Sequence, residues 1–412
     1  MNIVVIVESS TKAKTISKYL NKIDPKNKYN VVASNGHVCD VVKKNMGLDL
    51  KTFQPNYEII SDKKKTVANL KELSKSADLI LLAADNDREG EAIAWHLKQI
   101  LKPKRDKRIV FNEITPDALK NAINNPKDVD MDMVNAQQAR RIMDRLVGFN
   151  LTKVLWNNFY AKTLLSAGRV QSVVLYIIVQ KESKISSFVS EQYWTIYGNF
   201  THDIEAKLYE GETIYKFRNA NDVVLVLKKL SKEEFYLKSN SLTTKEFKEY
   251  PDLPFTTSTL QQKATSIGFS IKQTMKIAQE LYEHGHISYM RTDSTSISQQ
   301  FKSQLKVYVE KEYGTQVLSE DTRKSKSQKN AQEAHEAIRP TKLVIPSSLS
   351  TDQLKLYMLI FHRTISYVMR PAVYKELNIK IHCKFLDNKK MYLLGKIRDI
   401  VYVGYKLSLI HI

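Results

Sequence analysis

Cysteine, glycine and proline are all scarce in this chain of 412 residues. The two cysteines, Cys39 and Cys383, lie in unlike contexts and form no Cys-x-x-Cys pair. They exclude a disulfide framework and a zinc ribbon, and they fit a reducing, cytoplasmic compartment. With 12 glycines and 10 prolines against 42% apolar residues, the chain is neither fibrous nor disordered. Its length predicts about two to four domains.

Long hydrophobic runs are missing as well. The first run, residues 3–7, ends at Glu8 and is too short for a signal-peptide core or a membrane span, so we expect no insertion into a membrane. A phosphate-binding P-loop is also missing. The only Gly-Lys pair, Gly395 and Lys396, is followed by Ile397 and has Lys390 where the first glycine belongs. We therefore expect no ATP site.

Positive charge is abundant. There are 64 Lys and Arg against 44 Asp and Glu, which gives a formal net charge of +20. Such an excess repels itself in a compact chain, and the usual reason to tolerate it is a polyanionic partner. Nucleic acid and an anionic membrane surface both fit, although no long basic amphipathic helix supports the membrane.

The hydrophobic periodicity divides the chain. Apolar runs at residues 3–7, 31–33, 79–84 and 109–111 alternate with helical segments at 11–20 and 91–101, which predicts an α/β domain with a mostly parallel sheet. Helical spacing follows from residue 134 to 178. Alternating, strand-like segments at 193–200 and 377–385 flank a helical block from 255 to 372. We therefore predict a β domain interrupted by a helical insertion.

The strongest local signal is an acidic cluster directly after the run at 79–84. If the segment is extended, Asp85, Asp87 and Glu89 project to one side, and close carboxylates favour a bound Mg²⁺. Glu8 and Lys12 follow the first strand and add a carboxylate and a phosphate-binding ammonium. The alternative is a solvated acidic turn that caps the next helix.

Arginines and a tyrosine form further candidate sites. Arg140 and Arg141 lie on a predicted helix, and arginine suits phosphodiester oxygens, although a surface pair of Arg140 with Asp144 is the simpler interpretation. Arg291 follows Tyr289 by two residues, where its charge would lower the pKa of the hydroxyl and stabilise a phosphoryl transition state.

Nine segments, in this order, resemble the type IA DNA topoisomerases, and most closely the bacterial-type topoisomerase I. They are IVVIVESSTKAKTISKYL, SNGHV, DNDREGEAIAWHL, FNEIT, NAQQARRIMDRLVGFN, LSAGRVQSV, PFTTSTLQQ, SYMRTDST and AHEAIRP. The resemblance implies a multidomain chain of α/β and mainly α parts. It comprises a Toprim domain (1–128), a helical DNA-gripping domain (129–190), a β hinge domain (191–252 and 373–407) and a helical domain with the active tyrosine (253–372).

The resemblance also implies residue roles. Tyr289 would be the nucleophile that forms a 5′-phosphotyrosine, and Glu8 the proton donor to the leaving 3′ oxygen. Lys12, Arg291 and His335 would position the phosphate, and Mg²⁺ would be held by Asp85, Asp87 and Glu89 with Glu8 beside them. The DNA-binding residues would be His37, Arg108, Arg140, Arg141, Asp144, Arg169 and Gln171.

The function implied is relaxation of negatively supercoiled DNA, without ATP, by a monomer that acts on single-stranded segments. The resemblance is strong over residues 1–340 and weaker up to about residue 407, where the family continues with helices that complete the gripping domain. The alternative is therefore a shortened remnant that binds or cleaves single strands without completing strand passage.

Overall fold

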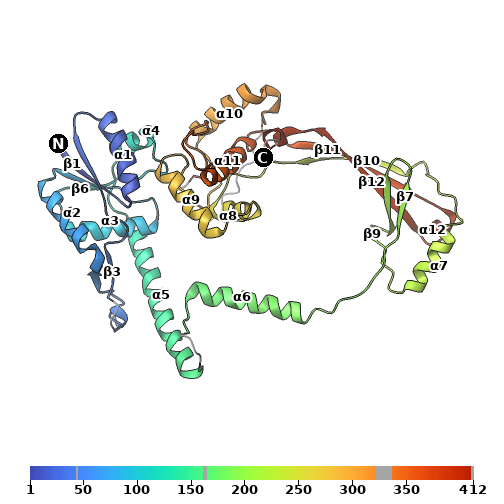
Figure 1. Ribbon diagram of the computed structural model, residues 1–412, viewed down its shortest axis with the longest axis horizontal. Coiled ribbons are helices and arrows are strands. Elements are labelled where there is room, and N and C mark those ends of the chain that lie inside the picture. Colours follow the sequence, from blue (N-terminus) through green and yellow to red (C-terminus); the bar gives the residue numbers. More distant parts are fainter. Residues whose placement is uncertain (43–44, 161–164, 321–335, 410–412) are drawn as a thin grey trace. The chain divides into compact units, whose positions relative to one another are not determined.

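The computed structural model describes residues 1–42, 45–160, 165–320 and 336–409 (Figure 1). The chain divides into two compact units. Unit 1 comprises Met1–Ser183, Leu253–Phe301 and Lys324–Thr364, and unit 2 comprises Lys184–Asp252, Lys302–Arg323 and Ile365–Ile412. Among the described residues, no helix is long and apolar enough to cross a membrane.

Unit 1 begins with a parallel four-stranded sheet in the order β2-β1-β5-β6. Its β-branched strand β1 (Asn2–Val7) is buried from Ile3 to Val7, as expected for a strand covered on both faces. The other strands are β2 (Lys28–Ala33), β5 (Leu79–Leu82) and β6 (Asp106–Arg108). They alternate with helices α1 (Ser10–Ile23), α2 (Lys64–Ser76), α3 (Arg88–Leu101) and α4 (Pro116–Asn124).

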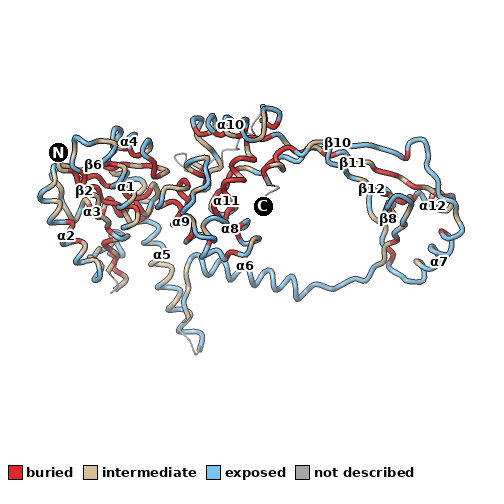
Figure 2. Tube along the Cα trace, turned by 45° about the horizontal axis from the view of Figure 1, so that its top comes forward, coloured by how far each residue is buried: buried red, intermediate tan, exposed pale blue. Residues whose placement is uncertain are grey.

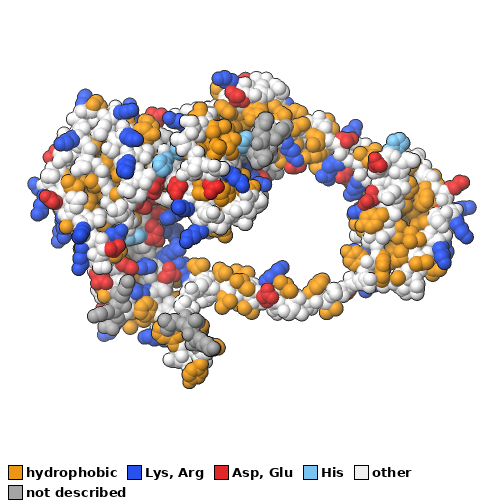
Figure 3. Space-filling model, viewed as in Figure 1, with side chains coloured by type: hydrophobic (Ala, Val, Ile, Leu, Met, Phe, Trp, Pro, Cys, Tyr) orange, Lys and Arg blue, Asp and Glu red, His pale blue; other side chains and the backbone are white. Residues whose placement is uncertain are grey.

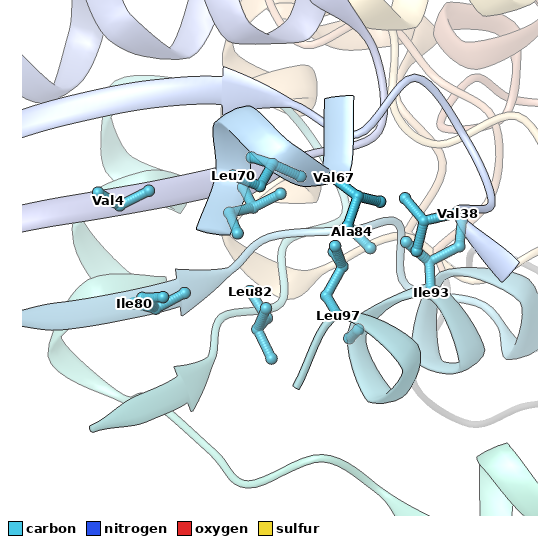
Figure 4. Close-up of a cluster of buried hydrophobic side chains, with 11 residues drawn as sticks. Val4, Val38, Val67, Leu70, Ile80, Leu82, Ala84, Ile93 and Leu97 are labelled. Atoms are coloured by element: carbon cyan, nitrogen blue, oxygen red, sulfur yellow. The ribbon is translucent and has the colours of Figure 1, made fainter. Parts of the chain in front are cut away.

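A hydrophobic core joins this sheet to its helices. Val4 of β1 and Leu82 of β5 pack in one buried cluster with Leu70 of α2 and Leu97 of α3 (Figure 4). Burial of this apolar surface is the main force that holds the carboxyl ends of β1 and β5 side by side. Those two strand ends carry Glu8 and the acidic cluster.

One predicted strand is misplaced. The fourth strand was expected at residues 109–111, but β6 is Asp106–Arg108 and Ile109 follows it. Ile109 and Phe111 are buried, so their apolar character reports burial rather than strand pairing. The chain also forms a small antiparallel pair, β3 (Cys39–Val41) with β4 (Tyr57–Ile59), that the sequence pattern did not indicate.

Helices follow this sheet, and the predicted helical block is divided between the two units, because Lys302–Arg323 and the residues from Ile365 on belong to unit 2. The long helix α5 (Met131–Asn158) packs on α3 and is followed by α6 (Arg169–Ser186), which has no buried residue (Figure 2). The predicted helical block contains α8 (Thr257–Ser266), α9 (Ile271–Glu283), α10 (Gln299–Tyr313) and α11 (Thr351–Ser366). The short 3₁₀ helices are Asn45–Gly47, Ser61–Lys63, Thr315–Val317 and Gly404–Leu409.

Unit 2 is built on an antiparallel sheet in the order β10-β11-β12-β8-β7, with β9 on β8. Strands β7 (Tyr197–Phe200), β8 (Ile204–Glu210), β9 (Thr213–Ile214) and β10 (Leu242–Glu249) precede the helical block, whereas β11 (Ala372–Ile381) and β12 (Met391–Tyr402) follow it. This confirms a β domain interrupted by a helical insertion.

The alternation at 377–385 overstates one strand. Strand β11 ends at Ile381, and Cys383 is the N-cap of the short helix α12 (Lys384–Asn388). Helices α12 and α7 (Ala220–Leu230) cover one face of the sheet, where Leu386 and Leu230 join a core with Leu208 and Leu393. Cys383 therefore continues the apolar alternation because its side chain is buried in this core, although its backbone already begins a helix.

Candidate active site

The ends of β1 and β5 bring three titratable groups together. Glu8 follows β1, and its Oε1 accepts a hydrogen bond from the backbone N–H of Asp85 at 2.9 Å. Lys12, in the first turn of α1, places its Nζ 2.5 Å from Asp85 Oδ1 and is 1% exposed. Ser9 is the N-cap of α1, and its hydroxyl accepts a hydrogen bond from Lys12 N. This cap fixes where α1 begins, and so which way the Lys12 side chain points. Buried Asp85 therefore has an internal counter-ion.

The acidic cluster is not extended beyond Asp87, so the prediction that all three carboxylates project to one side of an extended segment is wrong. Asp87 is the N-cap of α3, where its Oδ1 accepts from Gly90 N at 2.8 Å, and Glu89 lies in the first turn of that helix. The capping alternative therefore holds for Asp87. In the part of the chain that the structure describes, no group of three His, Cys, Asp or Glu side chains is placed to hold a metal ion.

Each carboxylate instead has a donor of its own. Asp85 takes Lys12, Asp87 Oδ2 accepts from the Tyr289 hydroxyl at 2.5 Å, and Glu89 Oε2 lies 3.1 Å from His37 Nε2. Gln137 of α5 also donates to Glu89 Oε2, at 3.0 Å. The donor set suits a divalent cation, because such ions prefer carboxylate oxygens. A bound cation would add its positive charge to that of the donors that now balance these carboxylates.

Tyr289 comes from the helical block, 202 residues from its partner Asp87. It is 3% exposed, and its backbone N–H donates to Asn112 O at 2.8 Å, which fixes the loop against the α/β part of unit 1. Arg291 NH1 lies 3.4 Å from the same Asp87 oxygen. The structure thus brings together Glu8, Lys12, Asp85, Asp87, Tyr289 and Arg291 within unit 1. His335 lies outside the described residues.

Arg291 lowers the pKa of the Tyr289 hydroxyl, as expected, but larger effects outweigh it. Burial, followed by the charges of Asp85 and Asp87, raises the pKa of Tyr289 well above its ordinary value. Arg291 opposes this shift but is the smallest of the contributions. The hydroxyl is therefore held neutral, and its proton is hydrogen-bonded to Asp87.

Two other carboxyls shift in opposite directions. Burial, and then the charge of Asp85, raises the pKa of Glu8 to about 7. The hydrogen bond from His37 is the largest influence on Glu89, and its pKa is lowered to about 2. Environments that separate the pKa values of neighbouring carboxyls separate their chemical roles. Glu8 suits proton transfer, whereas Glu89 stays ionised.

Tyr282 is a site residue that the sequence did not reveal. It lies on α9, is fully buried, and donates from its hydroxyl to Asp85 Oδ1 at 3.3 Å. Its ring packs edge-on against Tyr289 with centroids 5.1 Å apart, and Lys12 Nζ lies 5.1 Å from the ring centroid. The available signal was a tyrosine on the apolar face of a predicted helix, which usually indicates only core packing.

Arg108 does not belong with the DNA-binding residues. Its side chain is 1% exposed, its Nε donates to Glu91 at 2.9 Å, and its NH2 donates to Asp85 O at 2.7 Å. Its NH1 donates to Leu82 O and Ile109 O. Burial of an arginine requires such partners, so the predicted contact with DNA is wrong. Arg108 instead holds the backbone at the end of β5.

The other predicted DNA-binding residues gather along α5. A cavity of about 330 Å³ is lined by His37, Glu89, Gln137, Arg140, Arg141 and Asp144, among others. Arg169 Nε lies 2.8 Å from Asp144, and Gln171 donates to Ser166. The described partner of Asp144 is thus Arg169 rather than Arg140. Figure 3 shows acidic and basic side chains side by side near α5.

Comparisons with known proteins agree with this arrangement. Residues 3–114 match the Toprim domain family, a domain that binds a divalent metal ion, and residues 128–408 match the family described as DNA topoisomerase. The fold is similar to full-length topoisomerase I from Thermotoga maritima, with a TM-score of 0.85 and 38% identity. That alignment covers 99% of this chain and 67% of the other. The chain belongs to the bacterial-type type IA DNA topoisomerases, enzymes that relax DNA by transient strand cleavage.

Proposed function

We propose that Tyr289 cleaves one strand of negatively supercoiled DNA, with Mg²⁺ as the metal ion, and that Glu8 assists as a proton donor. The observation that carries this proposal is the 2.5 Å hydrogen bond from the Tyr289 hydroxyl to Asp87, next to Glu8 and Lys12. A tyrosine from the helical block therefore lies among the acidic groups of the Toprim half. The reaction is inferred from the family to which the chain belongs, and this arrangement supports the roles that we assign to the individual residues.

The proposed step balances without an external energy source. The Tyr289 oxygen attacks the phosphorus, its proton passes to Asp87, and the bond from phosphorus to the 3′ oxygen breaks. Glu8 gives a proton to that leaving oxygen, which becomes a 3′-hydroxyl while the phosphate remains on Tyr289. Because one ester replaces another, the reverse step rejoins the strand without ATP.

The protonation states suit these roles. With its pKa raised to about 7, Glu8 carries a proton on a substantial fraction of molecules near neutral pH. Arg291 lies where it can stabilise negative charge that develops on the phosphate, and Lys12 can do the same once it leaves Asp85.

Mg²⁺, when held by Asp85, Asp87 and Glu89, supplies positive charge that offsets these carboxylates beside the anionic strand. His37, Arg140, Arg141, Asp144, Arg169 and Gln171 hold the single-stranded segment along α5. The chain works as a monomer in a reducing, DNA-containing compartment such as the bacterial cytoplasm.

The first prediction tests the nucleophile. Tyr289→Phe removes the attacking oxygen but keeps the ring, so we expect neither a covalent DNA adduct nor plasmid relaxation, with single-strand affinity within about twofold of the parent. Tyr19→Phe, on α1 outside the site, is the matched control. An adduct that survives Tyr289→Phe contradicts the assignment. If the parental chain cleaves oligonucleotides but does not relax plasmid DNA, its function is limited to cutting and rejoining single strands.

A further inference from the structure

The sheet of unit 2 has two unlike faces. Ala206 and Leu208 on β8, Leu393 on β12, and Ile379 on β11 point into the core under α7 and α12. Because side chains alternate along a strand, their neighbours Lys207, Tyr209, Tyr392 and Lys380 point to the opposite face, where all four are half-buried. Figure 1 shows this sheet together with α7 and α12.

Aromatic rings run across this opposite face. Tyr392 pairs with Tyr209 in the strand register, and their ring centroids lie 6.1 Å apart with planes inclined by only 13°. His382 follows on the other side of Tyr392 at 6.3 Å, and Tyr236 lies 6.3 Å beyond His382. We call this set, Tyr209, Tyr392, His382 and Tyr236, the aromatic row.

Lysines lie directly beside the aromatic row. In the next register position, Leu394 pairs with Lys207 on one side and Lys380 on the other. Lys380 Nζ is 4.6 Å from the Tyr392 ring centroid, and Lys207 Nζ is 5.2 Å from that of Tyr197, which is 50% exposed. One step further, Lys396 and Glu205 follow on the same face. Three lysines thus stand against one glutamate at this end of the aromatic row, whereas at its other end Asp387 is hydrogen-bonded to His382 and Tyr236.

We propose that this face binds a second single-stranded segment of the DNA substrate, separate from the strand held at Tyr289. Bases would stack on the aromatic row, because an aromatic ring accepts the face of any base without sequence preference. Lys207 and Lys380 would bind the phosphates on either side. Opposite charges do pair elsewhere on the sheet, as in Arg398 of β12 with Glu376 of β11 at 3.0 Å, but Lys207 and Lys380 lie beside aromatic rings instead.

The proposal rests on DNA as the substrate and extends the proposed function to a second binding surface. It predicts base stacking in addition to charge attraction, which separates it from a surface for acidic peptides. An acidic peptide would use the lysines but would gain little from the flat run of rings. The experiment therefore removes the rings and the charges in separate variants.

The experiment measures binding of a long thymidine oligonucleotide to the full chain. Tyr209→Ser with Tyr392→Ser should weaken binding at least about thirtyfold, because each of the two stacked bases contributes roughly 1–3 kcal/mol. Lys207→Gln with Lys380→Gln should reduce the slope of log affinity against log salt by about 1.4, two phosphate contacts at about 0.7 each. The charge-matched control is Lys228→Gln with Lys232→Gln. These two exposed lysines lie in the last turn of α7 and just after it, and their loss should change neither the affinity nor the salt slope.

Two readouts keep the outcome separate from the chemistry at Tyr289. Ultraviolet crosslinking of the oligonucleotide should label peptides that contain Tyr209 or Tyr392, and all these variants should cleave a short oligonucleotide at the parental rate. Parental affinity in the tyrosine variant overturns the proposal. Equal displacement of the oligonucleotide by polyglutamate of the same charge also overturns it, since a general polyanion surface needs no stacking. Loss of the adduct in Tyr289→Phe bears only on the proposed function.

Discussion

Glu8 and Glu89 are the same side chain in different surroundings, and their pKa values differ by several units. Glu8 is buried beside Asp85 and has a pKa of about 7, while Glu89 accepts hydrogen bonds from His37 and Gln137 and has a pKa of about 2. Glu8 can therefore release a proton in the pH range where the chain works, and Glu89 cannot. Burial is the main cause of the raised pKa of Glu8, and hydrogen bonding, first from His37, is the main cause of the lowered pKa of Glu89.

Tyr282 should position the reacting groups without touching the DNA. Tyr282→Phe removes the hydroxyl that donates to Asp85 but keeps the ring against Tyr289. A single hydrogen bond contributes about 0.5–1.5 kcal/mol, so we expect the single-turnover rate of adduct formation to fall about three- to tenfold. The strand affinity should stay unchanged, because the loss affects the rate constant rather than binding.

The ring of Tyr282 provides the comparison. Tyr282→Leu should slow cleavage further, since it also removes the edge-on contact with Tyr289 and the cation–π contact with Lys12. A parental cleavage rate for Tyr282→Phe, with slow cleavage for Tyr282→Leu, would show that only packing matters and that the hydroxyl has no positioning role.

His96 should make the stability of unit 1 depend on acid pH. It is 5% exposed against Tyr57 and Trp95, and burial lowers its pKa from 6.5 to about 4. Between these values the unfolded chain binds a proton that the folded chain refuses. Stability from this group is therefore complete above pH 6.5 and declines as pH falls toward 4, by up to about 3 kcal/mol.

The measurement is a difference between two chains. His96→Phe keeps an aromatic ring but cannot titrate, so its free energy of unfolding relative to the parent should rise steadily from pH 7 to pH 4.5. Other groups that titrate in this range contribute equally to both chains and cancel. Parallel pH profiles of the two chains would contradict the role given to His96.

At the scale of elements, the turn from β5 to α3 determines where the acidic groups lie. A Cβ on Gly90 would lie 2.2 Å from the backbone oxygen of Asp85. Gly90→Ala must therefore move Asp85, whose N–H donates to Glu8 and whose oxygen accepts from Arg108. We expect a loss of about 1–3 kcal/mol in the free energy of unfolding, as for other overpacked sites, together with loss of adduct formation.

Gly148 offers the matched control for that change. It lies inside α5, where an added Cβ would meet only Ala167 O at 3.6 Å. Gly148→Ala should therefore raise the free energy of unfolding by up to about 1 kcal/mol, the usual gain from removing a glycine inside a helix. Denaturant unfolding of both variants measures the contrast, and equal stability of the two would contradict the close approach at Gly90.

At the scale of the whole molecule, local pattern predicted elements well and side-chain environments poorly. The run at residues 3–7 was correctly predicted as a buried strand, because five adjacent apolar residues fit a strand that is covered on both faces. Arg108 was misjudged because its partners, Glu91 and the Leu82 carbonyl, lie on other elements. The geometry of the acidic cluster was misjudged because the prediction assumed an extended segment up to Glu89, whereas the N-cap hydrogen bond of Asp87 begins helix α3 before that residue.

The meeting of Tyr289 with Asp87 has no local signal. The two residues lie 202 positions apart, and only the tertiary fold brings an oxygen of one to the other. The resemblance to a known family located them because the motifs carry information from many folded relatives. Tyr282 lies on helix α9 and in none of the quoted motifs. Only the structure therefore placed it beside Asp85.

The net charge of +20 leads to the last prediction, on binding strength as a function of salt. Not every positive charge can contact DNA: Arg108, for example, is buried in an ion pair with Glu91. The slope of log affinity for single-stranded DNA against log salt should therefore report the phosphate contacts, at about 0.7 per contact, and not the whole charge. Arg140→Gln, on the cavity that includes Glu89, should reduce this slope by about 0.7, whereas Lys120→Gln, exposed on α4, removes the same charge and should leave it unchanged. Equal slopes for the two variants would mean that the charge acts as a diffuse field, and that α5 is not where the strand binds.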